Sequence, residues 1–121
     1  MSLPMWIGVA AFGGFGAVGR YVVGTALSRR TDSPFPVGTF VVNLSGAFAL
    51  GLLSGLAVSD DLSKLLGLGA LGAYTTFSTW MLETNRLAEE HRGRLDLLYL
   101  VASVLLGLLA VWAGRELGAA L

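Results

Sequence analysis

The sequence alternates between long apolar runs and short polar breaks. The four runs extend over about residues 4–27, 37–58, 62–87 and 95–117. An α-helix needs about 20 apolar residues to cross the hydrocarbon core of a bilayer, and each run reaches that length. Ser59 directly precedes the third run, where its side chain is suited to cap a helix. The pattern predicts an all-α membrane protein of four transmembrane helices, with residues 1–121 forming a single four-span domain.

Composition places the chain in the lipid bilayer and excludes several function classes. Hydrophobic residues make up 55% of the sequence, charged residues 13%, and the mean hydropathy is +0.72, which predicts a multi-pass protein of the cell membrane. A formal net charge of zero argues against nucleic acid as a partner. There is no cysteine for a thiolate metal site. The single histidine, His91, lies in a polar break without a nucleophile beside it, so we expect no enzyme.

Most of the glycines are interpreted as helix-packing positions. Gly51 and Gly55 form a small-xxx-small pattern, which lets two membrane helices approach closely. Residues 14–19 match the G-x-G-x-x-G pattern of dinucleotide-binding proteins, and Asp32 follows at a suitable distance. That fold needs alternating strands and helices, whereas every later run here is long and apolar. We therefore predict that residues 14–19 pack inside a membrane helix.

Two polar side chains inside the first two runs stand out, because polar groups are costly in hydrocarbon and usually face protein or an aqueous path. Asn43 offers two donors and one acceptor, and it either joins two helices or lines a pore. Arg20 is the only basic residue that lies within a span away from its ends. Its permanent charge either attracts anions or extends to the membrane interface.

The middle of the third run, residues 72–80, carries an unusual polar stretch. Gly72 is followed by β-branched Thr75 and Thr76, a combination that favours a helix broken at its middle. The alternative is an intact helix whose hydroxyls bond to their own turn. Non-helical backbone at membrane depth lies within protein or against a cavity, and its carbonyls are then available as cation ligands.

Aromatic and hydroxyl side chains recur at helical spacing in the last two runs. Phe77 and Trp80 share one helix face, and the positive edge of an aromatic ring can face an anion. Tyr99 and Ser103 share a face four residues apart, forming a hydroxyl track. Acidic residues stay near the ends of the runs, which argues against a proton-coupled exporter with a central carboxylate.

Three motifs, in this order and spacing, resemble the CrcB/Fluc fluoride channel family along essentially the whole chain. They are GGFGAVGRY (residues 13–21), GTFVVNLSG (38–46) and GAYTTFSTW (72–80). The resemblance implies a passive, fluoride-selective channel that exports cytoplasmic fluoride without ATP or proton coupling. It also implies an antiparallel, dual-topology dimer with two pores and a structural sodium ion at the dimer interface.

The resemblance assigns roles by motif position. It places the following residues along the fluoride pore: Arg20, Asn43, Thr76, Phe77, Ser78, Trp80, Tyr99 and Ser103. Asn43 would donate a hydrogen bond to fluoride, and Phe77 would contact the anion with its ring edge. Arg20 would lie at the pore vestibule. Backbone carbonyls of Gly72 and Thr75 from both subunits would hold the sodium ion.

One position departs from the family pattern. The second aromatic residue is usually Phe, and here it is Trp80. Indole is larger and adds an N–H donor. It therefore narrows the path, binds the anion differently, or marks a subunit whose second pore wall has decayed.

The charge of the breaks bears on the second subunit. Five arginines lie in the first and third breaks, against one lysine and one arginine at the opposite face: Arg29, Arg30, Arg86, Arg92 and Arg94, against Lys64 and Arg115. Positive residues favour the cytoplasmic side, which would place both termini outside. We expect a homodimer, with a heterodimer as the alternative. The alternative functions are a small four-helix transporter and a non-conducting partner subunit of a heterodimeric channel.

Overall fold

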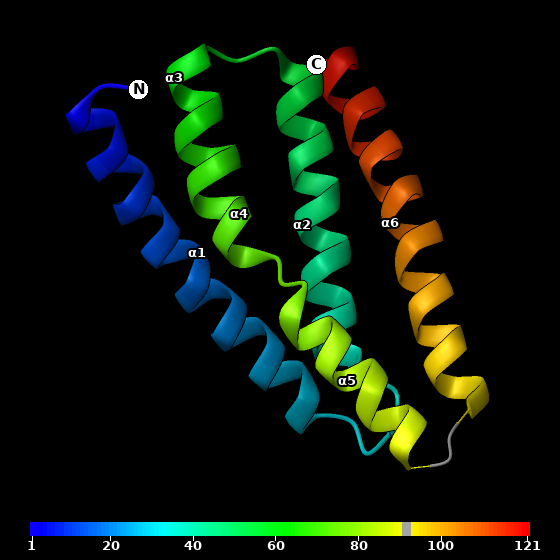
Figure 1. The fold of residues 1–121 in the computed structure, drawn as a ribbon. Helices are drawn as coiled ribbons and strands as arrows, with labels where there is room; N and C mark the ends of the chain where they lie inside the picture. Colours follow the sequence, from blue (N-terminus) through cyan, green and yellow to red (C-terminus); the bar gives the residue numbers. More distant parts are fainter. Residues whose placement is uncertain (91–92) are drawn as a thin grey trace.

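The computed structural model describes residues 1–90 and 93–121, apart from the side chain of Ser78, and every regular element in this part is helical. Four helical segments lie side by side, with both termini at one end (Figure 1). They are α1 (Leu3–Arg29), α2 (Val37–Leu56), a third segment made of α3 (Asp60–Ser63), η1 (Lys64–Leu71), α4 (Gly72–Tyr74) and α5 (Ser78–Glu89), and α6 (Gly93–Ala120). Each predicted run falls on one segment, so the all-α prediction is confirmed.

Three helices of the described chain are long and apolar enough to cross a membrane, namely α1, α2 and α6. They contain 27, 20 and 28 residues, and about 20 are sufficient. The third segment is divided into shorter helices, so none of its parts reaches that length. The segment nevertheless belongs to the bundle, because η1 and α4 contact α1 while α5 contacts α6.

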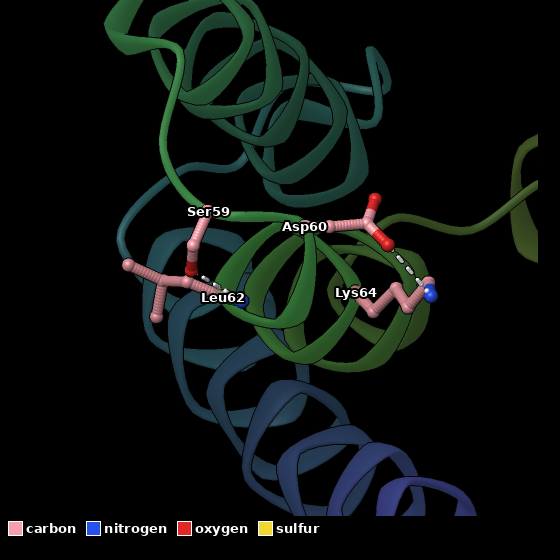
Figure 2. A network of polar contacts seen from close by, with 4 residues as sticks. All are labelled: Ser59, Asp60, Leu62 and Lys64. Carbon is pink, nitrogen blue, oxygen red and sulfur yellow. Dashed lines mark hydrogen bonds and ion pairs between the residues drawn. The ribbon is translucent and has the colours of Figure 1, made fainter. Parts of the chain in front are cut away.

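The start of α3 confirms the cap predicted at Ser59. The Ser59 hydroxyl accepts a hydrogen bond from the N–H of Leu62 at 3.3 Å (Figure 2). One turn later Lys64 pairs with Asp60 at 2.8 Å. The hydrogen bond and charge of Lys64 hold the pKa of Asp60 below its ordinary value. A carboxylate in the first turn also complements the positive end of the helix dipole.

Glycines bring α2 and α6 into close contact. A Cβ added to Gly51 or Gly55 would collide with a backbone carbonyl of α6. Gly114 and Gly118 of α6 are reciprocally close to the backbone of α2. The predicted small-xxx-small pattern of α2 is therefore confirmed as a packing surface, and α6 supplies a matching one.

The G-x-G-x-x-G stretch lies inside α1, as predicted, and it forms no phosphate-binding turn. Gly16 is buried, and a Cβ there would collide with the carbonyl of Ala70 in η1. Gly19 lies against the ring of Tyr74 in α4, while nothing lies near Gly14. Of the three glycines, Gly16 is the one whose missing side chain lets α1 approach the third segment closely.

The third segment changes its backbone geometry twice. η1 is a π-helix, a form that is rare and often found at functional sites. The α-helical turn of α4 then ends at Tyr74, and α5 begins at Ser78 (Figure 1). Between them Thr75 is extended, with φ −77° and ψ 159°. We call residues 75–77, which lie outside the helices, the 75–77 segment.

A large apolar surface remains exposed on the outside of the bundle. Phe15 of α1 is 79% exposed, and Trp112 of α6 is 60% exposed. Buried apolar side chains are few, and Val42 and Tyr99 are the largest that are fully enclosed. Such a surface is typical of a chain surrounded by apolar solvent rather than water.

Candidate functional site

The side chain of Asn43 holds the 75–77 segment against α2. Its Nδ2 donates to the carbonyl oxygen of Thr76 at 3.0 Å, and its Oδ1 accepts from the N–H of Thr76 at 2.9 Å. One amide side chain thereby satisfies both backbone groups of a residue that no helix supports. The amide keeps one further N–H that these two bonds do not use.

The same bonds release two carbonyl groups. In a continuous α-helix the N–H of Thr76 would bond to the carbonyl of Gly72, but it donates to Asn43 instead. The N–H of Thr79 would likewise bond to the carbonyl of Thr75, but it donates to the hydroxyl of Thr76 at 3.3 Å. The carbonyl oxygens of Gly72 and Thr75 therefore lose their usual helical partners. These are the two residues whose carbonyls the family resemblance assigns to sodium.

Arg20 contacts the middle residue of α4. Its Nε donates to the carbonyl oxygen of Ala73 at 3.1 Å, across from α1. The side chain lines a cavity of about 530 Å³ together with residues of α1, α2 and α5, including Thr79 and Glu83. Arg20 is thus turned inward to the third segment, and we call this space the Arg20 cavity.

A second cavity, of about 380 Å³, gathers most of the predicted pore residues, and we call it the Trp80 cavity. The predicted residues that line it come from α2, the third segment and α6: Asn43, Gly72, Thr75, Thr76, Phe77, Trp80 and Ser103. Small residues, Gly46 and Gly107 among them, complete the wall. Thr76 lines both cavities, so the 75–77 segment lies between them.

Two aromatic rings form one side of the Trp80 cavity. The ring centroids of Phe77 and Trp80 are 5.7 Å apart with an interplanar angle of 74°, an edge-to-face arrangement. Phe77 is 69% exposed in the single chain, so the cavity is open beside it. α5 begins next to Phe77, which directs the positive end of its dipole toward this region.

Two buried polar atoms that line this cavity have no partner. Among the described residues, the buried side-chain atoms without a hydrogen bond are Trp80 Nε1 and Ser103 Oγ. A buried donor left unsatisfied costs about 1–3 kcal/mol. Native proteins usually satisfy such groups with protein, water or a ligand.

Tyr99 lies apart from Ser103, although the two share a helix face. Its ring is fully enclosed and meets Phe35 edge to face, with centroids 5.3 Å apart. Its hydroxyl donates to Glu83 at 3.4 Å, at the boundary of the Arg20 cavity. The side chain of Ser78, also assigned to the pore, lies outside the described part of the structure.

Sequence reasoning missed the contribution of Phe35 and Thr79. Phe35 lies between two prolines in the first break, where nothing in the sequence indicates that its ring packs on Tyr99. Thr79 provides an N–H to Thr76 and lines the Arg20 cavity. Thr79 belongs to the polar stretch of residues 72–80, but the spacing of that stretch does not distinguish Thr79 from its polar neighbours.

Comparison with known proteins gives a consistent set of relatives. The model of the family described as "CrcB-like protein, Camphor Resistance (CrcB)" matches residues 7–115. The chain is 53% identical over 116 residues to "Fluoride-specific ion channel FluC 2" of Mycolicibacterium paratuberculosis, covering 96% of this chain and 95% of that protein. It is 48% identical over 115 residues to the protein of the same name from Mycobacterium tuberculosis, covering 95% and 91%. The Clostridium acetobutylicum protein of that name is 42% identical over 103 residues, covering 85% and 88%.

Proposed function

The chain belongs to the CrcB family, and we propose that it is a passive, fluoride-selective ion channel that exports cytoplasmic fluoride. It is a multi-pass protein of the plasma membrane, with three helices that are long and apolar enough to cross a bilayer. Family membership also indicates a channel rather than an enzyme. We further propose that residues 1–121 form a single domain whose third segment crosses as one broken helix.

The observation that carries this proposal is the Trp80 cavity. It combines ring edges, a hydroxyl and the amide of Asn43 in a space that is otherwise lined by apolar and small residues. Fluoride is small and strongly hydrated, so it needs close donors in exchange for its water. Hydroxyl groups and the positive edges of aromatic rings provide such contacts without a fixed cation that would trap the anion. The relatives named as fluoride channels support the choice of fluoride among anions.

Conduction in this proposal is downhill. Arg20 raises the local anion concentration at the Arg20 cavity, and Thr76 connects that cavity to the Trp80 cavity. The dehydrated ion then contacts the remaining amide N–H of Asn43, the ring edge of Phe77 and the hydroxyl of Ser103. No proton transfer or ATP hydrolysis is required, because the gradient supplies the free energy.

We propose that a second subunit completes the pore. Phe77 is largely exposed in the single chain, so the Trp80 cavity has an open side beside this ring. An antiparallel, dual-topology dimer would close the open side of the cavity in each subunit and produce two pores. A homodimer is the preferred assembly, and a heterodimer with a subunit of opposite orientation is the alternative.

We also propose a structural sodium ion at the dimer interface. The carbonyl oxygens of Gly72 and Thr75 fit this ion, because both have lost their helical N–H partners to side chains. Within residues 1–90 and 93–121, no group of three acidic, histidine or cysteine side chains is placed to hold a metal, so backbone oxygens are the natural ligands. Two such carbonyls from each subunit would supply oxygen ligands around the ion. The positive charge of the ion would compensate the partial negative charges of these oxygens.

Fluoride efflux from liposomes that contain only this protein tests the proposal. We expect efflux above that of empty vesicles, and loss of efflux in Phe77→Ile. Phe15→Ile on the outer face of α1 makes the same change at a 79% exposed position and should conduct normally. An absence of efflux from the unmodified protein would contradict a self-sufficient homodimer channel, and normal efflux from Phe77→Ile would contradict the pore assignment.

A further inference from the structure

Trp80 presents a hydrogen-bond donor in the Trp80 cavity that no group of the described residues accepts. Its Nε1 is buried and unpartnered, and so is the hydroxyl oxygen of Ser103, which lines the same cavity from α6. Trp80 and Ser103 come from different helical segments. Their two atoms are the buried side-chain atoms without a partner in the described chain, and both residues line this one cavity. Their coincidence indicates a shared ligand rather than two separate packing defects.

The chemistry of the indole restricts that ligand. Indole N–H donates and cannot accept, so the ligand must be an acceptor: an anion or a water oxygen. The serine hydroxyl rotates and can donate to the same acceptor. A cation is disfavoured at this point, because the N–H carries positive charge toward it.

The surrounding contacts hold the indole in place. The ring of Phe77 meets that of Trp80 edge to face at 5.7 Å, which restricts rotation of the larger ring. Asn43 can add only one N–H to these donors, because its other N–H donates to the carbonyl of Thr76. Among the described residues, the side-chain donors of this cavity without an acceptor include the indole N–H, the hydroxyl of Ser103 and one amide N–H of Asn43.

We infer that the Trp80 indole N–H and the Ser103 hydroxyl together form a two-donor site for the permeating anion, so that Trp80 acts as a specificity-determining residue. This inference rests on the proposed function. A tryptophan here contributes a directional hydrogen bond, whereas a phenylalanine contributes only its ring edge. A fixed donor favours a small, strongly accepting anion over a larger one that accepts weakly.

Removing the donor while keeping the ring tests the inference. In Trp80→3-benzothienylalanine a sulfur atom replaces the N–H at nearly the same size. We expect fluoride efflux from liposomes to fall about tenfold or more, the effect of losing one hydrogen bond to a charged group. Trp80→Phe removes the same donor but supplies the ring edge that is usual in the family at this position, so it is the weaker test. Trp112→Phe, at a position 60% exposed on α6, is the matched control and should conduct normally.

A second measurement reports the N–H directly. The chain has three tryptophans, so tryptophan labelled with ¹⁵N gives three indole signals, and Trp80→Phe identifies the one from Trp80. Sodium fluoride should move this signal in detergent micelles, and equal sodium chloride should move it less. In Ser103→Ala the fluoride-induced shift should require a higher fluoride concentration.

The two measurements separate the inference from the proposed function. Two results together would overturn the inference alone: normal efflux from the benzothienylalanine protein, and a Trp80 indole signal in the unmodified protein that fluoride does not shift. No efflux from the unmodified protein, again without a shift, would overturn the inference and the proposed function together. A reduced rate with a fluoride-dependent shift supports both.

Discussion

Replacing Asn43 by alanine removes both hydrogen bonds that join α2 to the 75–77 segment. The N–H and the carbonyl of Thr76 then lose their partners, and neither group makes another hydrogen bond to the described residues. Each unsatisfied buried group costs about 1–3 kcal/mol, so the variant should lose about 2–6 kcal/mol of folding free energy. The lower part of this range applies if water enters the adjoining cavities and solvates Thr76.

We expect Asn43→Ala to lose fluoride efflux as well. Phe77 belongs to the 75–77 segment and Trp80 lies in the first turn of α5 after it, so a change in the path of the segment displaces both rings. Asn43→Asp is the complementary change, because a carboxylate still accepts from the Thr76 N–H but no longer donates to its carbonyl. This variant should also abolish efflux. It removes the hydrogen bond that Asn43 donates and keeps the one that Asn43 accepts, so it tests the two bonds separately.

Asn85→Ala provides the matched control. Asn85 lies on the exposed face of α5 and bonds only to Glu89, at 3.2 Å. A surface change of this kind usually alters stability by no more than about 0.5 kcal/mol. Unfolding can be followed by far-UV circular dichroism as SDS is added to the protein in mixed micelles, alongside efflux from liposomes. If Asn43→Ala matches Asn85→Ala in both measurements, Asn43 does not hold the 75–77 segment.

Two further predictions concern packing and pH. Gly114→Ala should destabilise the protein by about 1–3 kcal/mol in the same unfolding assay, because its Cβ would collide with the Phe48 carbonyl. Gly107→Ala, where the space is open, should instead be neutral or stabilising. Equal losses of stability in the two variants would contradict the close packing of α2 against α6 at Gly114. Lys64→Met should raise the pKa of Asp60 toward 3.8, as measured by NMR titration, because Lys64 holds that pKa below 3.8. The lowered pKa means that this contribution to stability is present above pH 3.8 and disappears as the pH falls through the folded value; an unshifted titration would contradict the pairing.

The sequence was sufficient for the helices and for part of their packing. Apolar runs of membrane-spanning length predicted each helical segment, and turn chemistry predicted the cap at Ser59. The spacing of Gly51 and Gly55 predicted a close helix contact but not its partner. Close contact needs a complementary surface, and the choice of α6 depends on the register of two helices that are far apart in the sequence.

The candidate site was predictable by residue type but not by geometry. Asn43 was noticed because an amide is costly in hydrocarbon, and joining two helices was one of its two expected roles. Its partner turned out to be the backbone of Thr76, 33 residues away, which no local pattern encodes. Tyr99 and Ser103 share a face by spacing, yet a helix face is wide enough for α5 to enclose one near Glu83 while the other lines the Trp80 cavity.

Hydrogen-bond exchange at the 75–77 segment would allow one stretch of backbone to contribute to both of the proposed ion sites, for sodium and for fluoride. Asn43 and the Thr76 hydroxyl take two N–H groups out of the helix, and the carbonyls of Gly72 and Thr75 are left available to a cation. On the cavity side the same residues position aromatic edges and donors that suit an anion. Neither role requires a charged side chain at membrane depth, where charge is costly. In this account Asn43→Ala weakens sodium and fluoride binding together, whereas Trp80→Phe weakens fluoride binding and leaves the sodium carbonyls intact.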